Sequence, residues 1–233
     1  MTSDTRMSQA VARPIRTLVY LDANVLAAGI TRSLMLLAAP LSNFRVVWSP
    51  YAEIEAARHQ PPGARPISEV RELHNLQTVP DADSPMTLVD TDVKDRPILG
   101  AAAAAGARFV VTENVKDFGT SDLERLHLSA VHPDLFLSTR LSLSVYQAVL
   151  DALAINRKRD PFTPAAIHAM EVARKLPRLF AQHRDSLGVD AKTPVARPAK
   201  LQVRGSRCVR CDTIMTGWGD RGLGFCPDCE QMA

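Results

Sequence analysis

The stretch Arg16-Thr-Leu-Val-Tyr-Leu-Asp-Ala-Asn-Val-Leu26 contains the pattern that decides the fold. Its first half is a short apolar run that favours a buried strand, and the apolar positions from Asn24 to Ala39 then recur at helical spacing. The same order returns at Phe44–Trp48, where Ser49-Pro50 predicts the cap and first residue of a helix that continues to His59. The chain therefore begins with two strand–helix units.

Further units of the same kind follow along the chain. The sequence predicts a helix over Pro97–Ala105 that ends at Gly106, a strand over Arg108–Val111, a last strand over Leu126–Val131, and a less regular unit around Leu76–Val79. Each strand is a continuous apolar run, which favours a parallel sheet covered by helices on both faces. The predicted fold class is three-layer α/β, with two more helices over Ser144–Arg157 and Thr163–Arg184.

Composition and charge limit the class of protein. A chain of 233 residues with 46% hydrophobic residues has room for one main domain and a small appendage. The polar N-terminus and the absence of 18 consecutive uncharged apolar residues predict a cytoplasmic protein without a membrane span. The net charge is only +3, but residues 157–207 hold 12 Lys/Arg against 4 Asp/Glu. Within them, Arg157, Lys158 and Arg159 are candidate RNA contacts, and the alternative is a solvated helix face and linker.

Acidic side chains follow the carboxyl ends of the predicted strands, where an open parallel sheet binds its ligands. They are Asp22 after the first strand, Glu53 and Glu55 in the helix after the second, Asp95 at the start of the Ala-rich helix, and Glu113 and Asp117, with Asn114, after Thr112. Grouped carboxylates repel one another unless a cation neutralises them, and hard oxygen ligands select Mg²⁺ or Mn²⁺. Such an ion can activate water for attack on a phosphodiester.

Each of these acids also has a structural interpretation. Asp95 can cap its helix, Glu53 and Glu55 can favour a helix N-terminus through the helix dipole, and Asp117 can stabilise a turn. The joint pattern favours the metal site, because four regions distant in sequence bring carboxylates to one edge of the sheet. No glycine-rich phosphate loop follows Leu21, which argues against a nucleotide site.

Several stretches together resemble the PIN-domain family, in particular its branch of bacterial toxin-like ribonucleases. They are Val19-Tyr-Leu-Asp-Ala-Asn-Val-Leu26, Val46-Val-Trp-Ser-Pro50, Asp95-Arg-Pro-Ile-Leu-Gly-Ala-Ala102, Phe109-Val-Val-Thr-Glu-Asn-Val-Lys-Asp-Phe118 and Leu128-Ser-Ala-Val-His-Pro-Asp-Leu-Phe-Leu137. The resemblance covers residues 16–185 and implies a Rossmann-like PIN domain with a parallel sheet, an acidic metal site and cleavage of RNA phosphodiesters.

The resemblance also implies roles for single residues. Asp22 matches the first acid of the family and Asp95 the third. Spacing from Ser49 favours Glu55 as the second acid, whereas the local Ala-Glu-Ile pattern favours Glu53. Two residues apart on a helix, these side chains point in different directions, so only one should line the site.

The fourth acid departs from the family pattern. Many relatives have Gly-Asp where this chain has Glu113-Asn114, so the implied fourth acid is Asp117, with Asn114 as a polar helper. This departure leaves room for reduced activity. Asn24 and Thr112 resemble the supporting polar residues of the family.

The four cysteines form two pairs near the C-terminus, Cys208-Val-Arg-Cys211 and Cys226-Pro-Asp-Cys229, with 14 residues between the pairs. Two such knuckles can place four thiolates around one structural Zn²⁺, and a closed site of this kind serves binding rather than catalysis. Disulfides and a rubredoxin-like iron site are the alternatives. Residues 207–233 are the predicted zinc ribbon and residues 186–206 a flexible linker, so loss of Cys208 should unfold only the tail.

The sequence favours a metal-dependent endoribonuclease that acts on RNA. The toxin-like resemblance implies an inhibitory antitoxin protein as a partner, and a homodimer is a further candidate assembly. One alternative is a non-catalytic RNA- or protein-binding adaptor that acts through its zinc ribbon, which the Glu113-Asn114 departure motivates. Another is a PIN nuclease specialised for one RNA-processing event.

Overall fold

The computed structural model describes residues 16–82, 87–156, 162–215 and 224–231. The strands lie in one sheet in the order β2-β1-β3-β4-β5. Their bounds are β1 Thr17–Leu21, β2 Phe44–Val47, β3 Phe109–Val111, β4 Ser129–Val131 and β5 Val203–Gly205. The pairs β1–β2, β1–β3 and β3–β4 are parallel, and β5 pairs antiparallel with β4.

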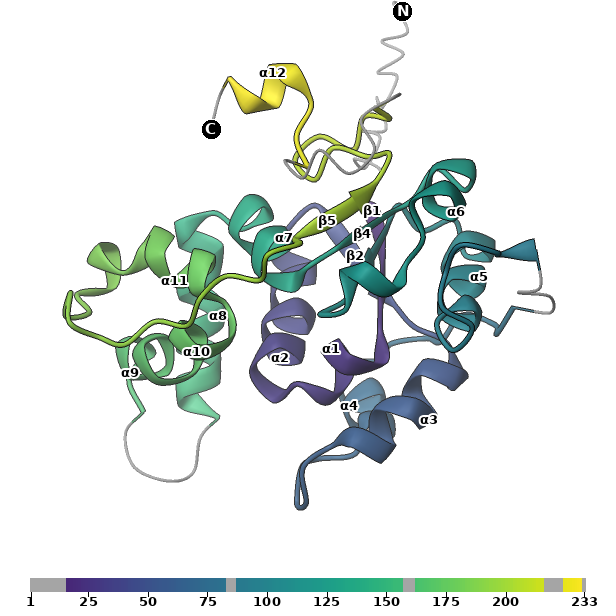
Figure 1. Ribbon diagram of the computed structural model, residues 1–233. Coiled ribbons are helices and arrows are strands. Elements are labelled where there is room, and N and C mark those ends of the chain that lie inside the picture. The colour runs from purple at the N-terminus through teal and green to yellow at the C-terminus, as the bar shows by residue number, and fades with distance from the viewer. Residues whose placement is uncertain (1–15, 83–86, 157–161, 216–223, 232–233) are drawn as a thin grey trace, which may run out of the picture.

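Helices cover both sides of this sheet, so the predicted three-layer α/β fold is confirmed. The main helices are α1 Ala23–Ala27, α2 Gly29–Ala38, α3 Pro50–His59, α4 Ile67–Leu73, α5 Arg96–Ala104, α6 Thr120–Arg125, α7 Pro133–Arg140, α8 Leu143–Ile155, α9 Pro164–Ile167, α10 Ala173–Lys175, α11 Pro177–His183 and α12 Pro227–Glu230. Figure 1 shows α5 and α6 on one side of the sheet and α1, α2 and α7 on the other, with α8 to α11 outside them.

Two of the predicted helices are divided in the structure. The helix expected over Asn24–Ala39 is interrupted at Ala28, whose backbone is extended, just before a helix-disfavouring Gly29. The helix expected over Thr163–Arg184 breaks at Leu176, because Pro177 disfavours helical geometry at the residue before it. Between α9 and α10 the chain forms a π-helical turn, His168–Val172.

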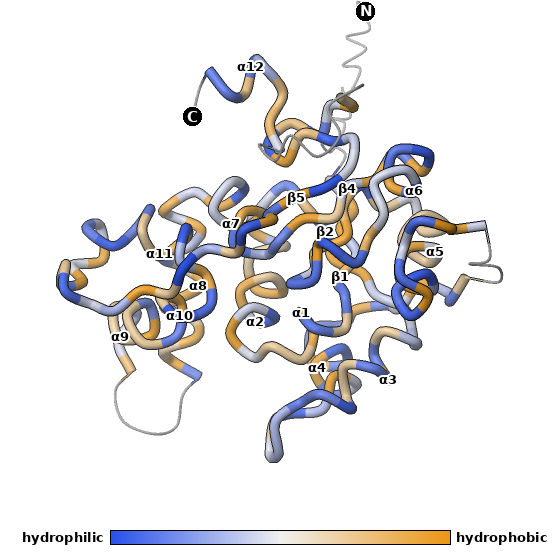
Figure 2. Tube along the Cα trace, in the orientation of Figure 1, coloured by the Kyte–Doolittle hydropathy of each residue, from blue (hydrophilic) through white to orange (hydrophobic). Residues whose placement is uncertain are grey.

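A single hydrophobic core joins the sheet and its helices. Tyr20, Trp48, Phe109 and Phe136 are among its largest fully buried side chains. Figure 2 shows hydrophobic stretches running through the sheet and the helices around it, with hydrophilic stretches in loops and along parts of the outer helices. In the part of the chain that the structure describes, no helix combines the length and apolar character needed to cross a membrane.

The segment expected to be a flexible linker, residues 186–206, contributes a strand to the sheet. β5 pairs residue by residue with β4, and Val203 and Val209 both belong to the main hydrophobic core. Gly205 has a φ of +111°, and a Cβ there would lie 2.3 Å from the carbonyl oxygen of Leu128. Only glycine therefore fits this close approach. The division into domains at residues 185 and 206 stays a prediction. The segment between these boundaries contributes β5 to the sheet of the main domain.

Candidate functional site

Asp22 lies at the carboxyl end of β1 and is the centre of a polar network. Its Oδ1 accepts the Ala23 backbone N–H at 2.6 Å, so it caps α1. Its Oδ2 accepts from Nδ2 of Asn24 at 2.7 Å and from the hydroxyl of Thr112 at 2.6 Å. Asn24 in turn accepts the Glu113 N–H at 3.0 Å. The structure thus brings Asn24 and Thr112, both expected to support the site, onto the first acid.

Asp95 lies near Asp22 but lacks comparable partners. Burial and the negative charges of Asp22, Asp117 and Asp92 together raise the pKa of Asp95 to about 7, against the opposing charge of Lys94. Although Asp95 is the N-cap of α5, its side chain makes no capping hydrogen bond, and its buried Oδ2 has no partner among the described residues. The helix-cap interpretation therefore does not account for this carboxylate.

The two candidates for the second acid have different surroundings. Glu53 accepts a hydrogen bond from Nε1 of Trp48 at 2.9 Å and pairs with Arg71 at 3.1 Å. Glu55 instead acts on the first acid through its charge, which raises the pKa of Asp22. Burial is the largest cause of that shift, which takes the pKa of Asp22 to about 6 against the hydrogen bonds from Thr112 and Ala23.

The fourth region reaches the site through the loop after β3. Asp117 ends a short 3₁₀ turn, Val115–Asp117, and its charge acts on Asp95. Its carbonyl oxygen accepts the Asp92 N–H at 2.9 Å. Asn114 donates its backbone N–H to the Thr112 hydroxyl at 3.0 Å, while its side chain is exposed. At the carboxyl edge of the sheet, charge interactions therefore connect four acids: Asp22, Glu55, Asp95 and Asp117.

The chemistry of this group suits a hard divalent cation. The site has several acids, two of them with raised pKa values, and one buried carboxylate oxygen without a partner. Among the described residues, these carboxylates do not form a compact group of three or more metal ligands as the cysteines do. Mg²⁺ commonly binds through one or two carboxylates and keeps several waters, which matches an open site of this kind.

The raised pKa of Asp22 predicts how stability depends on pH in the metal-free protein. The folded state binds a proton on Asp22 more tightly than the unfolded state does, so protonation of Asp22 stabilises the fold. This contribution to stability is fully present below the unfolded pKa and is lost as the pH rises through about 6. A shift of about two units corresponds to about 3 kcal/mol. Asp22→Asn should therefore gain about that much relative to wild type between about pH 4 and about pH 8.

Urea unfolding of both proteins in the presence of a chelator measures this difference. Burial lowers the pKa values of His132 and His168 to about 4, so these residues destabilise the protein as the pH falls. This effect is the same in both proteins, so the difference between wild type and variant isolates Asp22. A difference that does not change with pH would contradict the shift at Asp22. Added Mn²⁺ should stabilise wild type more than the variant.

The cysteine cluster lies at the opposite end of the strands. Sγ atoms of Cys208, Cys211, Cys226 and Cys229 all lie within 4.8 Å of one another, and none of the four forms a disulfide. This arrangement is consistent with a zinc ribbon and can hold a metal ion. Figure 1 shows this cysteine module, residues 207–215 and 224–231, above the sheet, whereas α1 begins at the lower end of β1. The two candidate centres are thus separated by the length of the strands.

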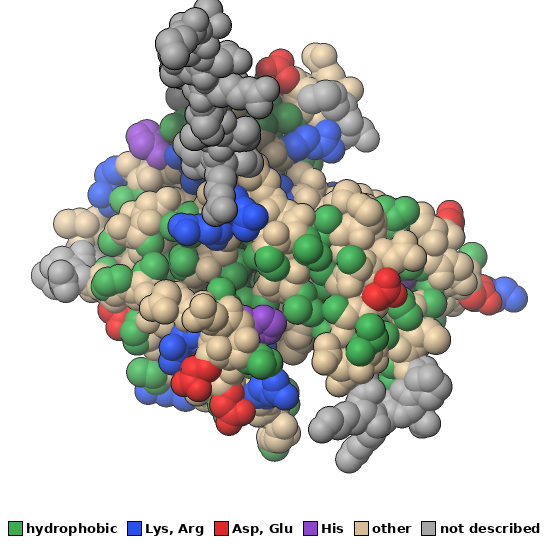
Figure 3. All heavy atoms as spheres, turned by 180° about the vertical axis from the view of Figure 1, so that it is seen from behind, with side chains coloured by type: hydrophobic (Ala, Val, Ile, Leu, Met, Phe, Trp, Pro, Cys, Tyr) green, Lys and Arg blue, Asp and Glu red, His purple; other side chains and the backbone are tan. Residues whose placement is uncertain are grey.

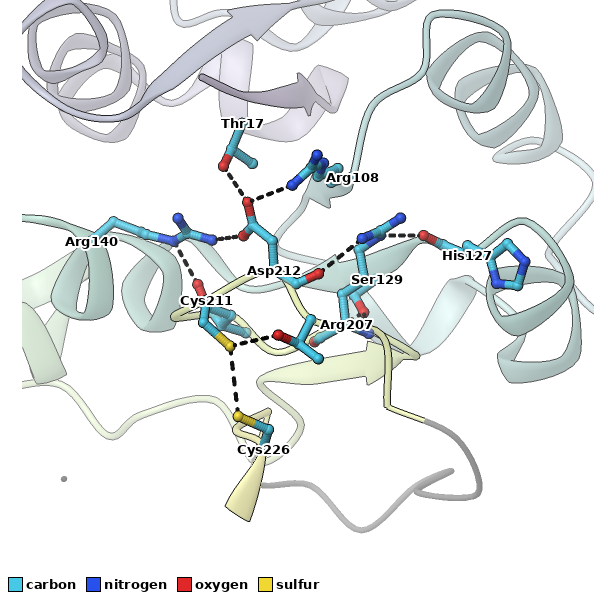
Figure 4. Close-up of polar contacts among 11 residues, drawn as sticks. Thr17, Arg108, His127, Ser129, Arg140, Arg207, Cys211, Asp212 and Cys226 are labelled. Atoms are coloured by element: carbon cyan, nitrogen blue, oxygen red, sulfur yellow. Dashed lines mark hydrogen bonds and ion pairs between the residues drawn. The ribbon is translucent and has the colours of Figure 1, made fainter. Parts of the chain in front are cut away.

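Asp212 connects the cysteine module to the main domain, a role that the sequence did not reveal. Its buried carboxylate accepts hydrogen bonds from Thr17 at the start of β1 and from Arg140 on α7, and it pairs with Arg108 at 3.3 Å. Figure 4 shows these groups converging on Asp212 next to the knuckle that holds Cys211. Asp212 has a φ of +65°, a conformation in which Asp and Asn are enriched. The contact between Thr17 and Asp212 joins residues 195 positions apart in the chain, so no local sequence pattern predicts it.

Arg140 and Arg207 reinforce this connection. The guanidinium of Arg140 lies 5.5 Å from the ring centroid of Phe109 and 5.7 Å from that of Phe136. Arg207 donates to the carbonyl oxygen of Asp212 at 2.9 Å and to that of His127, which precedes β4. The module is therefore attached to the amino-terminal ends of several strands as well as through β5.

The proposed RNA contacts Arg157, Lys158 and Arg159 lie outside the described residues, as does Trp218. On the back of the molecule, some Lys and Arg side chains lie near the end that carries the cysteine module, and others lie at the lower end beside Asp and Glu side chains (Figure 3).

Sequence comparison gives one partial likeness that bears on function. Over 95 residues the chain is 34% identical to "Putative ribonuclease VapC50" of Mycobacterium tuberculosis, covering 37% of this chain and 56% of that protein. The chain thus spans little more than half of that relative's length. No protein-family model and no solved structure matches the chain.

Proposed function

We propose that this protein is a PIN-type ribonuclease that uses Mg²⁺ or Mn²⁺ to hydrolyse RNA phosphodiester bonds. The observation that carries the proposal is the group of Asp22, Glu55, Asp95 and Asp117 at the carboxyl edge of a parallel sheet, with an unpartnered buried oxygen on Asp95. The likeness to a protein named as a ribonuclease supports the same reaction class.

The chain's own residues would prepare this site in distinct ways. Asp22 and Asp95 would hold the cation, with Glu55 and Asp117 completing the negative field around it. Asn24 and Thr112 orient the Asp22 carboxylate through the hydrogen bonds described above. When bound, a divalent ion activates water and stabilises the charge that develops on the phosphate. Burial of Asp22 and Asp95 disfavours their ionised forms until a cation compensates, so affinity should rise with pH.

Two further assignments belong to this proposal. The four thiolates would hold one structural Zn²⁺, since a closed set of four cysteines is the usual ligand set for that ion. The protein would act as the toxin of a toxin–antitoxin pair, with an inhibitory protein as partner, because its sequence resembles the toxin-like branch of the PIN-domain family and the relative is named as a ribonuclease.

The matched pair Glu55→Gln and Glu53→Gln tests the proposed nuclease site. Removing the Glu55 charge should weaken Mn²⁺ affinity and slow cleavage at limiting Mn²⁺ by about 10-fold or more, since altered metal surroundings commonly cost that much. Glu53→Gln should keep its activity and lose at most about 1 kcal/mol of stability with the partly exposed Arg71 pair. Cleavage of a mixed single-stranded RNA pool across a Mn²⁺ titration gives the comparison.

If Glu53→Gln slows cleavage and Glu55→Gln does not, Glu53 is the second acid. Equal, wild-type activity of both variants at every Mn²⁺ concentration would remove this edge of the sheet from the reaction.

A further inference from the structure

A buried carboxylate on α6, outside the acidic group, holds the loop that leads to Asp95. Asp122 accepts the backbone N–H groups of three consecutive residues: Val89 at 3.3 Å, Asp90 at 3.0 Å and Thr91 at 2.9 Å. Asp122 is only 1% exposed. Three converging backbone donors fix both the position and the direction of this loop just before the segment that begins α5.

Arg125 binds both Asp122 and the loop that Asp122 holds. Its NH2 group donates to Asp122 at 3.0 Å and to the carbonyl oxygen of Thr87 at 3.0 Å. Burial opposes ionisation of Asp122, but the hydrogen bonds from Thr91 and Arg125 outweigh it and lower its pKa. Hydrogen bonds to an ionised acceptor are stronger than neutral ones, so this loop is held more firmly than an ordinary turn.

The same loop is attached to the segment that carries Asp117. The Gly119 N–H donates to the Thr91 hydroxyl at 3.1 Å, and the Asp92 N–H donates to the Asp117 carbonyl oxygen at 2.9 Å. A Cβ on Gly119 would lie 2.4 Å from the backbone carbon of Asp90, so the two segments touch without room for a side chain. A displacement of the loop at residues 89–92 would therefore move Asp95 and Asp117 together.

We propose that Asp122 is a positioning residue of the metal site, which sets the placement of Asp95 and Asp117 through the backbone of residues 89–92. The proposal rests on the nuclease function proposed above. Its physical basis is that carboxylates of like charge repel one another, so two acidic loops stay close only if other contacts hold them. Asp122 supplies these contacts from a helix outside the acidic group.

The test compares Asp122→Asn with Asp134→Asn, a matched control at the other side of the domain. Asp134 is also fully buried and accepts backbone N–H groups, from Arg178 at 3.0 Å and Leu179 at 3.1 Å at the start of α11. Asp122→Asn should lose stability, because its hydrogen bonds favour the charged form, and Asp134→Asn shows the effect of neutralising a buried carboxylate elsewhere in the domain. Only Asp122→Asn should bind Mn²⁺ more weakly, by about 10-fold, as is typical when support behind a metal ligand is lost. Calorimetric Mn²⁺ titration well below each melting temperature measures this.

Two further measurements separate positioning from general destabilisation. Saturating Mn²⁺ should restore the RNA cleavage rate of Asp122→Asn to within about 3-fold of wild type, because the ligands remain present and only their placement has changed. If Asp122→Asn fails to fold, Thr91→Val is the second variant. It removes the acceptor for the Gly119 N–H and the hydrogen bond of the Thr91 side chain to Asp122, and it should weaken Mn²⁺ binding in the same direction to a smaller degree.

The outcomes distinguish this inference from the proposed function. Wild type that binds Mn²⁺ and cleaves RNA, together with Mn²⁺ affinities of Asp122→Asn and Thr91→Val equal to that of Asp134→Asn, would overturn the positioning role alone. Wild type that binds no Mn²⁺ would overturn the nuclease proposal and the positioning role with it.

Discussion

We expect Asp22→Asn to lower Mn²⁺-dependent RNA cleavage by at least about 100-fold, since even the loss of a supporting partner costs roughly 10- to 100-fold at metal sites. The substitution keeps the size of the side chain and removes its charge at the centre of the network. Asn has a single acceptor oxygen, which can still accept from Asn24 and Thr112 at the Oδ2 position, but its amide nitrogen cannot accept the Ala23 N–H, so one hydrogen bond of this network is lost.

Stability should change in the opposite direction from activity. Near pH 8 without metal, relief of a buried charge is worth about 3 kcal/mol, which exceeds the roughly 1 kcal/mol of a lost hydrogen bond. Asp95→Asn should behave alike and lose activity. A residue that acted only as a helix cap would tolerate this change, because Asn caps nearly as well as Asp. Cleavage of an RNA pool and thermal melting of wild type and both variants provide the measurements.

Wild-type cleavage rates in both variants at saturating Mn²⁺ would exclude these acids as metal ligands. Absence of metal-dependent cleavage by wild type on any RNA offered would favour the adaptor function, in which the cysteine module does the binding.

We expect loss of the cysteine-bound metal to destabilise the whole domain. Cys208→Ser should release the proposed Zn²⁺ and loosen the knuckle that holds Asp212, which leaves Arg140 buried at 11% exposure without its counter-charge. Breaking a buried pair in this way costs about 3–5 kcal/mol. In a domain of this size the melting temperature should fall by roughly 10 °C. The sequence alone predicts instead that only the tail unfolds.

Trp48 fluorescence reports this effect directly, because Trp48 is fully buried in the main core. The chain has 2 Trp, so the experiment uses a Trp218→Phe background in which Trp48 is the single reporter. Asp212→Asn is the matched variant. Asn tolerates the left-handed backbone at φ +65°, so this change removes the charge and spares the four thiolates. It should keep about one Zn²⁺ per chain and still lower the Trp48 transition.

An unchanged Trp48 transition in Cys208→Ser, with the metal lost, would show that the module unfolds independently. Retention of full metal stoichiometry in Cys208→Ser would instead remove the assignment of four thiolate ligands.

The sequence by itself determined the local features of this protein. Continuous apolar runs before Asp22 and at Phe109–Val111 predicted buried parallel strands, because such runs are stable only between two layers of helices. The positions of the acids followed, since the residue after a strand must lie at its carboxyl end. The two Cys-x-x-Cys pairs likewise predicted a compact cluster, which the four neighbouring Sγ atoms confirm.

Only the tertiary structure decided how these parts combine. The surroundings of Glu53 depend on tertiary contacts, because this side chain bonds to Trp48, just after β2, and to Arg71 on α4. The strand β5 has three residues in a polar segment, too short for a recognisable pattern, and it forms because the edge of β4 offers hydrogen bonds. The contacts of Asp212 with Thr17, Arg108 and Arg140 join distant parts of the chain. Such contacts depend on the folded positions of both partners, so no spacing in the sequence encodes them.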